Sequence, residues 1–363
     1  METAEVVIAG GGAVGTSVAW HLAELGITDV VLLERDTLGS GSTAKSAGGF
    51  RMQFGDELNV RIAQRSLAEL AAMGDEIELQ QWGYLFLLDR DEDVAAFREA
   101  LAMQQSLGVP ARELTPAEAL DIVPQLDLDG VLAATYCPLD GYCSPEAVVQ
   151  WYARGAAERG VRIRQSAPLT GVRLRGGRIE RVEAGGEEIA TTTLVCTAGA
   201  WSGEIAAFAG VEVPVEGEPR HIWFTPTDGG LPAELPLTID FSTSFYFHRE
   251  GPGLVFGGRE TALEEVAEHA ARRLPVLTDL PIASSWWGYY EVSPDHNALV
   301  GESERVSRFL YATGFSGHGF QQAPAVGEHI AELIAGRAPT LDLAAFDVER
   351  FARGTPRRET VVI

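Results

Sequence analysis

The chain has 363 residues, of which 46% are hydrophobic, and this length suggests two domains or one domain with a large insertion. Its net charge of −24 argues against nucleic acid and anionic membrane surfaces as partners. Three cysteines without companions at zinc spacing, no signal peptide and no apolar run long enough for a bilayer predict a cytoplasmic protein without a metal.

The N-terminal segment has the pattern of a strand, a glycine turn, a helix and a second strand. Residues 6–9 are an apolar run typical of a buried parallel strand, and Gly10, Gly12 and Gly15 follow as G-x-G-x-x-G where a helical pattern begins. The next apolar run ends at Glu34, which can accept hydrogen bonds from a ribose and would repel a 2′-phosphate. The segment predicts a dinucleotide other than NADP on the helix N-terminus, with an ordinary glycine turn as the alternative.

Hydrophobic periodicity predicts the elements that follow along the chain. Helices are expected at 57–73, 91–107, 145–159 and 262–273, with another that begins at Thr115. Strands are expected at 83–88, 161–163, 171–174, 178–183, 194–197 and 309–313. Prolines and alternating strands between 211 and 290 favour an antiparallel sheet beside the parallel one.

A second glycine-rich turn, residues 314–319, lies between a strand and a helix expected at 325–334. The start of such a helix can face an anionic group, for example the N1–C2=O edge of a reduced flavin. A nicotinamide enzyme does not need this second unit, whereas a long cofactor held at both ends, such as FAD, does. A glycine loop without a ligand is the alternative.

Five blocks of sequence resemble a known group of flavoproteins. They are VVIAGGGAVGTSVAWHLAELG, GSGSTAKSAGGFRMQFGDELNVRIAQRS, GYLFLL, WWGYYEVSPDHNALVGE and ATGFSGHGFQQAPAVGE. With their spacing they cover nearly the whole chain, which resembles the D-amino-acid oxidase superfamily of FAD-dependent oxidoreductases. Within it, the chain is most similar to the sarcosine oxidase group, and above all to the β-subunits of heteromeric L-proline dehydrogenase and sarcosine oxidase.

Pattern and resemblance together predict an α/β fold with two domains. A discontinuous Rossmann-type FAD-binding domain is expected from residues 1–80, 146–210 and 291–363. A substrate-binding domain with a mainly antiparallel sheet and helices is expected from residues 81–145 and 211–290.

The resemblance implies FAD bound in an extended form along a defined set of residues. Those implied for the ADP half and the pyrophosphate are Gly10, Gly12, Ala13, Val14, Gly15, Glu34, Arg35, Ser42, Thr43 and Leu169. Those implied for the flavin half are Lys45, Ser46, Gly48, Gly49, Gly199, Trp201, Gly288, Gly317, His318, Gly319, Phe320 and Gln321.

In this family a hydride passes from the carbon beside an amine nitrogen to flavin N5, and water hydrolyses the imine that forms. The planar fork of Arg51 suits a substrate carboxylate, although an average arginine is a solvated surface residue. Tyr290 matches the family's substrate-site tyrosine. Tyr246, His248 and Arg259 are further candidates, for each of which a packing or surface role is the alternative.

The chain departs from the monomeric sarcosine oxidases at three positions. Gly288 stands where those enzymes attach FAD through a cysteine, so non-covalent FAD is expected. Val255 stands where they use a lysine to activate oxygen, which favours a dehydrogenase over an oxidase. Gln321 stands at the position of a second carboxylate ligand, so the substrate would be held by one cation, or would carry no carboxylate.

Three functions follow from these features. The first is an FAD-dependent dehydrogenase of sarcosine, proline or a related secondary amine, with an electron acceptor that the sequence does not identify. The second is an oxidase that releases hydrogen peroxide. The third is a flavin-binding subunit or assembly factor without catalysis. Resemblance to β-subunits makes a hetero-oligomer plausible beside a stand-alone protein.

Overall fold

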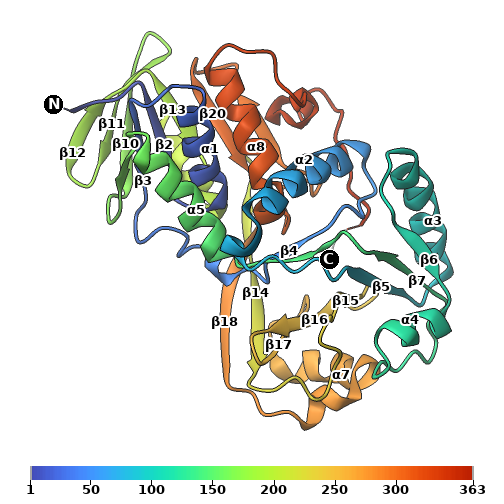
Figure 1. Cartoon of the computed structure of the whole chain (residues 1–363). Helices are drawn as coiled ribbons and strands as arrows, with labels where there is room; N and C mark the ends of the chain where they lie inside the picture. The colour runs from blue at the N-terminus through green and yellow to red at the C-terminus, as the bar shows by residue number, and fades with distance from the viewer. Residues whose placement is uncertain (1, 362–363) are drawn as a thin grey trace.

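The computed structural model describes residues 2–361, and a parallel sheet forms one half of it (Figure 1). The sheet has six strands in the order β19-β20-β13-β2-β3-β9, and only β19 and β20 run antiparallel. The strands are β2 (Val6–Ala9), β3 (Val30–Leu33), β9 (Arg162–Arg164), β13 (Thr193–Cys196), β19 (Leu299–Glu302) and β20 (Phe309–Thr313). The central strands are apolar and buried, because both faces of the sheet are covered.

Helices cover one face of this sheet and a smaller sheet covers the other. Along β2, Val6 and Ile8 pack against the helices, whereas Val7 and Ala9 pack on the opposite side, as the two-residue period of a strand requires. The helices are α1 (Ala13–Glu24), α2 (Glu57–Met73), α5 (Pro145–Glu158) and α8 (Gly319–Ile334). The opposite side holds α6 (Ser202–Phe208) and the strands β1 (Glu2–Thr3), β12 (Glu187–Ala190), β11 (Arg178–Ala184) and β10 (Leu169–Arg175).

An eight-stranded sheet forms the other half, and all its neighbours are antiparallel except β5 and β15. In sheet order its strands are β18 (Ser284–Val292), β14 (Glu216–Thr225), β17 (Gly253–Gly257), β16 (Phe245–Glu250), β15 (Leu237–Asp240), β5 (Tyr84–Leu88), β7 (Ala133–Cys137) and β6 (Arg112–Leu114). It carries the helices α3 (Asp91–Ser106), α4 (Pro116–Ile122) and α7 (Leu263–Arg273). In Figure 1, β14 and β18 run from this sheet toward the parallel one.

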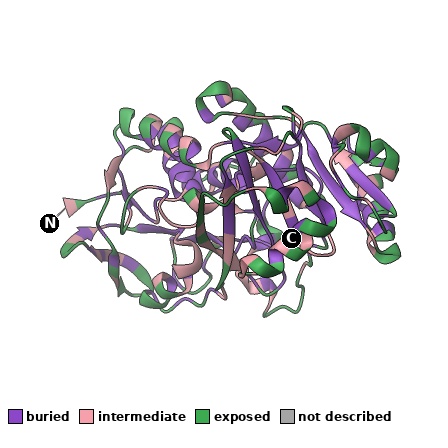
Figure 2. Cartoon of the chain, turned by 90° about the horizontal axis from the view of Figure 1, so that it is seen from below, coloured by how far each residue is buried: buried purple, intermediate pink, exposed green. Residues whose placement is uncertain are grey.

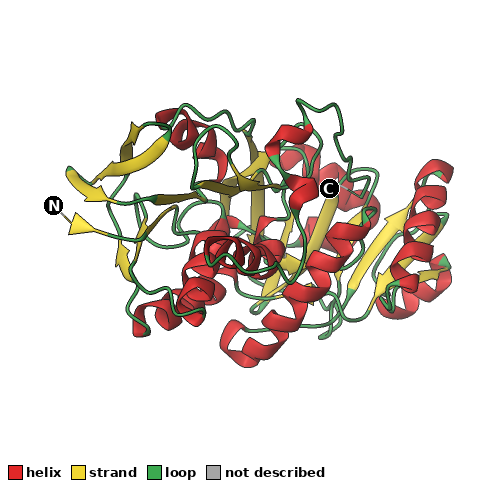
Figure 3. Cartoon of the chain, turned by 90° about the horizontal axis from the view of Figure 1, so that it is seen from above, coloured by secondary structure: helices red, strands yellow, loops and turns green. Residues whose placement is uncertain are grey.

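Burial follows this layered arrangement. Most strands of both sheets are purple in Figure 2, apart from β9, β14 and β18, while many exposed residues lie on the outer faces of helices and at turns. Figure 3 shows the helices flanking the sheets. The predicted α/β fold is therefore confirmed.

The start of α8 differs from its prediction. The helix begins at Gly319, six residues before the expected start at 325, and therefore contains Pro324. Proline has no N–H for the helical hydrogen bond, which is why the sequence pattern favoured a later start. Inside the helix the next amide, that of Ala325, donates to Ser66 Oγ at 3.2 Å, so α2 stabilises this turn.

The predicted domain boundaries remain predictions. The six-stranded sheet draws its strands from the three ranges expected for the FAD-binding domain. The eight-stranded sheet draws its strands from the other two ranges, except that β18 continues past the expected boundary at 290 to Val292.

Candidate functional site

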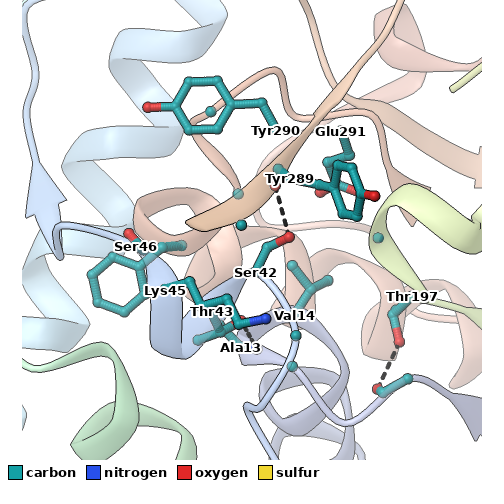
Figure 4. Close-up of a pocket in the computed structure, with 18 of the residues that line it drawn as sticks. Ala13, Val14, Ser42, Thr43, Lys45, Ser46, Thr197, Tyr289, Tyr290 and Glu291 are labelled. Atoms are coloured by element: carbon teal, nitrogen blue, oxygen red, sulfur yellow. Dashed lines mark hydrogen bonds between the residues drawn. The ribbon is translucent and has the colours of Figure 1, made fainter. Parts of the chain in front are cut away.

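One cavity of about 420 Å³ is lined by residues from both halves of the chain, some of which are drawn in Figure 4. It is lined by the ends of β2 and β3, by loop 41–49, by the segment after β13, by strands of the eight-stranded sheet that include β14, β16 and β18, and by the start of α8. It contains most residues that the sequence predicted for a flavin. Those that line it are Gly10, Gly12, Ala13, Val14, Glu34, Arg35, Ser42, Thr43, Lys45, Ser46, Gly49, Leu169, Gly199, Trp201, Gly288, Gly317, His318, Gly319, Phe320 and Gln321.

The turn between β2 and α1 requires glycine at two positions. Gly10 has φ +115°, and a Cβ on it would lie 2.3 Å from the carbonyl oxygen of Thr197. A Cβ on Gly15 would lie 1.9 Å from the carbonyl oxygen of Gly10. Gly15 does not line the cavity, and its role is to let α1 pack against this turn, which brings the start of the helix to the cavity wall.

Two helices begin at this cavity without a side-chain cap. The N-cap residue of α1 is Gly12, which has no side chain, and that of α8 is His318, whose side chain accepts no hydrogen bond from the helix. Among residues 2–361, a more distant side chain reaches the start of α1 only. Thr43 Oγ1 accepts from the N–H of Ala13 at 3.2 Å. A helix N-terminus carries a partial positive charge and attracts anionic groups. The cavity therefore suits a long ligand with electron-rich groups at two separate places.

At the first end of the cavity, Glu34 already has two hydrogen-bond donors. Its carboxylate accepts from the N–H of Gly11 and from that of Asp36, each at 2.8 Å. The acid that was predicted to bind a ribose thus also fixes the glycine turn. Beside it, the guanidinium carbon of Arg35 lies 3.6 Å from the centre of the Trp201 ring, close enough for a cation–π contact.

Loop 41–49 lies against β18. Ser42 Oγ donates to the carbonyl oxygen of Tyr289 at 2.7 Å, a bond drawn in Figure 4. The stem of Lys45 crosses Gly288, where an added Cβ would lie 3.0 Å from Lys45 Cβ. Lys45 Nζ lies 5.7 Å from the centre of the Trp287 ring. The only lysine of the chain is therefore part of the cavity wall.

Arg51 lies at the other end and is buried, with 2% of its surface exposed. Its Nη2 donates to the carbonyl oxygen of Val361 at 2.6 Å and to His318 Nε2 at 3.1 Å. Because arginine only donates, His318 Nε2 must accept, and the imidazole is neutral with its proton on Nδ1. Burial lowers the pKa of His318 well below its ordinary value, and the charge of Arg51 acts in the same direction.

Three tyrosines line the cavity near Arg51, namely the buried Tyr84 and the half-buried Tyr246 and Tyr290. Burial raises the pKa of each hydroxyl, so all three are protonated at neutral pH. Their hydroxyl groups make no hydrogen bond to any residue between 2 and 361, which leaves them available to a ligand. The arrangement is an apolar pocket with a few polar groups, as small-molecule sites commonly have.

Arg220 is a cation of the cavity wall that the sequence analysis missed. Its guanidinium carbon lies 4.9 Å from the centre of the Tyr290 ring, and Nη2 donates to Glu218 at 2.9 Å. Arg220 stands opposite Gly288 in the pairing of β14 with β18. Strand register is the signal that would have found it, because register decides which β14 side chains lie beside the predicted residues 288 and 290.

Glu291 was also missed, and it carries the most unusual carboxylate of the cavity (Figure 4). Burial raises the pKa of Glu291 to about 7, against the opposing effect of hydrogen bonds from Thr313 and from the amides of Gly314 and Phe315. The bond from Thr313 Oγ1 is 2.7 Å long. A carboxyl group with this pKa changes its charge near neutral pH, beside the loop that starts α8.

His248 and Arg259 do not line the cavity, and Gly48 lies behind its wall. His248 is on the same face of β16 as Tyr246, but two residues along a strand amount to about 7 Å, which carries it past the cavity. Its Nδ1 lies 2.7 Å from the carbonyl oxygen of Arg249, and burial lowers the pKa of His248 to about 4. Arg259 donates to Ser244 Oγ instead.

Between residues 2 and 361, no group of three His, Cys, Asp or Glu side chains is arranged to hold a metal ion. Nor does this part of the chain contain a helix with the length and apolar character needed to cross a membrane. All three cysteines are buried with free thiols, and none lines the cavity.

Known proteins resemble this chain over nearly its whole length. The family described as FAD dependent oxidoreductase matches residues 5–333. The chain is 32% identical to FAD-dependent oxidoreductase domain-containing protein 1 of Bos taurus, over 100% of this chain and 87% of that protein. It is 29% identical to mitochondrial sarcosine dehydrogenase of Homo sapiens over 96% of its own length, but it spans only 41% of that protein.

Among solved structures, the chain is similar to L-proline dehydrogenase from P. horikoshii. The two chains superpose with a TM-score of 0.92 at 34% identity, and the match covers 98% of this chain and 100% of that one. Glycine oxidase from Geobacillus kaustophilus superposes with a TM-score of 0.87 at 23% identity, which shows a shared fold.

Proposed function

This chain belongs to the family of FAD-dependent oxidoreductases, and on that premise we propose that it is a dehydrogenase of a secondary amine or amino acid resembling sarcosine or proline. The observation that carries the proposal is a cavity with two helix starts whose N-cap residues supply no capping side chain, and with a buried arginine among tyrosine hydroxyls. The first feature suits FAD and the second suits an amino-acid carboxylate beside it.

The residues of the cavity fit FAD in several respects. The two helix starts face it, the glycine turn leaves room for a pyrophosphate, and Glu34 lies at the end of β3 where a ribose is bound in such folds. When bound, FAD supplies an acceptor for the hydride from the substrate. Gly10, Gly12 and Ser42 would hold its phosphate side, while Gly317 and Gln321 would hold the flavin side. We expect the attachment to be non-covalent, because Gly288, at the position where monomeric sarcosine oxidases attach FAD through a cysteine, lines the cavity.

The protein's own contribution is to bind and orient the amine. Arg51 keeps N–H donors free for a carboxylate, and Tyr290 and Tyr246 present hydroxyl groups to the same space. An alkyl ammonium must lose its proton before hydride transfer, which costs about 4 kcal/mol at pH 7. A pocket walled by tyrosines reduces that cost, since a dry environment disfavours the charged form.

Two observations support a dehydrogenase that acts on such amines. Relatives named for sarcosine and proline oxidation match this chain over nearly its whole length. The strand residue Val255 is buried and apolar, so it supplies no cation that would help oxygen to react.

The test is an anaerobic titration of the purified holoprotein with sarcosine and with L-proline. Loss of the visible flavin band, followed by slow recovery in air, is the expected result. Fast recovery with release of peroxide would identify an oxidase, and no loss of the band with any amine would contradict a catalytic role.

Arg51→Ala tests the substrate site in the same assay. We expect KM to rise at least about thirtyfold, because a charge-assisted carboxylate contact is lost. Arg51→Lys, which keeps the charge without the planar fork, should fall between this variant and the unchanged protein. The matched control is Arg61→Ala, which removes a half-exposed arginine of α2 that pairs only with Glu57. An unchanged KM in Arg51→Ala would remove Arg51 from the site.

A further inference from the structure

The end of the described chain, residues 355–361, returns to the substrate end of the cavity. Hydrogen bonds and an ion pair hold the segment to the rest of the chain. The N–H of Arg357 donates to Asp295 Oδ2 at 2.9 Å, and the carbonyl oxygen of Arg357 accepts from Asn297 Nδ2 at 2.6 Å. The guanidinium of Arg357 also pairs with Asp56 at 2.6 Å. In Figure 1 this part of the chain, in red, descends past α2.

Glu359 is the buried anchor of the segment, with 1% of its surface exposed. One oxygen accepts from the N–H of Gly55 at 2.7 Å, and the other accepts from Asn59 Nδ2 at 2.8 Å. A buried carboxylate also needs a compensating positive charge. The buried cation Arg51 is close enough for its charge to attract that of Glu359. The two are also joined through Val361, because the N–H of Val361 donates to Glu359 Oε1 at 2.9 Å.

Val361 completes the contact. Its side chain is buried against Tyr84 and Phe86, and its carbonyl oxygen accepts from Arg51 Nη2. The guanidinium also donates to the carbonyl oxygen of Gln53 and stacks 4.2 Å from the centre of the Phe54 ring. A guanidinium has five N–H donors, and these contacts with the one to His318 use three of them.

We propose that segment 355–361 supports the substrate site from behind the cavity wall. Glu359 is then a positioning residue, which holds Val361 and thereby the Arg51 guanidinium so that an N–H donor that is still free meets the substrate carboxylate. The inference rests on the proposed function, because it takes Arg51 as the carboxylate ligand. It adds that the affinity of Arg51 for that carboxylate is set from the far end of the sequence. Without the carboxylate of Glu359 and the carbonyl of Val361, the guanidinium would lose its orientation.

The test is a double-mutant cycle between Arg51→Ala and Glu359→Gln in the FAD-loaded protein, with sarcosine or L-proline as substrate. We expect Glu359→Gln to raise KM about tenfold and to change kcat by less than about threefold. In the Arg51→Ala background the same change should add almost nothing. Glu304→Gln is the control, because it removes an exposed carboxylate that faces the half-exposed Arg353 at 3.9 Å.

The outcomes separate this inference from the proposed function. A KM that rises in Arg51→Ala but not in Glu359→Gln would overturn the role of the segment and leave Arg51 as ligand. Equal increases of KM by Glu359→Gln with and without Arg51 would overturn it as well. An unchanged KM in Arg51→Ala would refute both. If Glu359→Gln does not fold, Arg357→Ala loosens the segment at its ion pair with Asp56, and an unchanged KM there overturns the inference.

Discussion

The substitution Gly15→Ala sets two effects of opposite sign against each other. Gly15 lies inside α1, where alanine is normally better than glycine by about 1 kcal/mol. An added Cβ, however, would lie 1.9 Å from the carbonyl oxygen of Gly10 and 2.7 Å from Thr197 Oγ1. The first of these is a backbone atom that no rotamer change can move. Inserting a methyl group into a packed site costs about 1–3 kcal/mol, and a contact this short belongs at or above the top of that range.

We therefore expect a net loss of about 2 kcal/mol or more, which lowers Tm by about 4–8 °C. FAD affinity should fall as well, because the displaced carbonyl belongs to the turn that would hold the pyrophosphate. Thermal unfolding and FAD titration, followed by flavin fluorescence, measure the two effects. Gly41→Ala is the control, since Gly41 lines the cavity and a Cβ there would meet no atom within 4 Å. A higher Tm in Gly15→Ala would refute the packing argument, because helix propensity would then have prevailed.

Two further changes test the buried charges. The pKa of Glu291 is raised to about 7, whereas an ordinary glutamate has a pKa of 4.5. Between these pH values the folded protein keeps a proton that the unfolded chain has released. The free energy of unfolding should therefore fall as pH rises from 4.5 to 7. Chemical denaturation should show that the free energy of unfolding falls by up to about 1.4 kcal/mol per pH unit in this window, and that Glu291→Gln removes this fall. The same dependence on pH in the variant would contradict the raised pKa of Glu291. Arg350→Ala should cost about 3–5 kcal/mol, because it leaves the buried Asp295, 2.7 Å away, without its cation. Removal of the exposed Arg175, whose nearest carboxylate is that of Glu180, should change Tm by less than about 1 °C, and equal losses in both variants would sink this prediction.

The fold was predictable because its signals are local. The apolar run of β2, the glycine turn and the periodic pattern of α1 follow one another within 24 residues, and each reports on its own neighbours in the sequence. The same holds for α2, whose expected bounds of 57–73 agree with the structure. The start of α8 was placed too late for a physical reason. The sequence carries the penalty of Pro324, whereas the compensating hydrogen bond comes from Ser66 on another helix.

The cavity was predictable only where a motif or a resemblance pointed to it. Residues such as Gly10, Ser42 and Gly317 belong to recognisable glycine loops, and they line the cavity. Arg220 and Glu291 do not belong to such a loop, and they reach the cavity through the register of β14 with β18. Register depends on pairing between residues about seventy positions apart, so no short pattern contains it. His248 is the reverse case, since it lies on the same strand as Tyr246 but two residues further along, where it does not line the cavity.

Arg51, the proposed carboxylate ligand, shows that a residue type alone does not tell whether its side chain has hydrogen-bond donors left for a ligand. Its residue type and its place after the glycine loop suggest a carboxylate ligand, and those are local features. Whether the guanidinium can serve depends on how many donors the protein already uses, and that number is set by Gln53, His318 and Val361. The last of these lies 310 residues away in the sequence. A buried cation must be balanced and hydrogen-bonded wherever it is placed, so the chain supplies those partners from its two ends. On the proposal above, the affinity of Arg51 for a carboxylate depends on residues that are distant in the sequence. Substitutions in segment 355–361 should therefore alter this affinity although the segment does not contact the substrate.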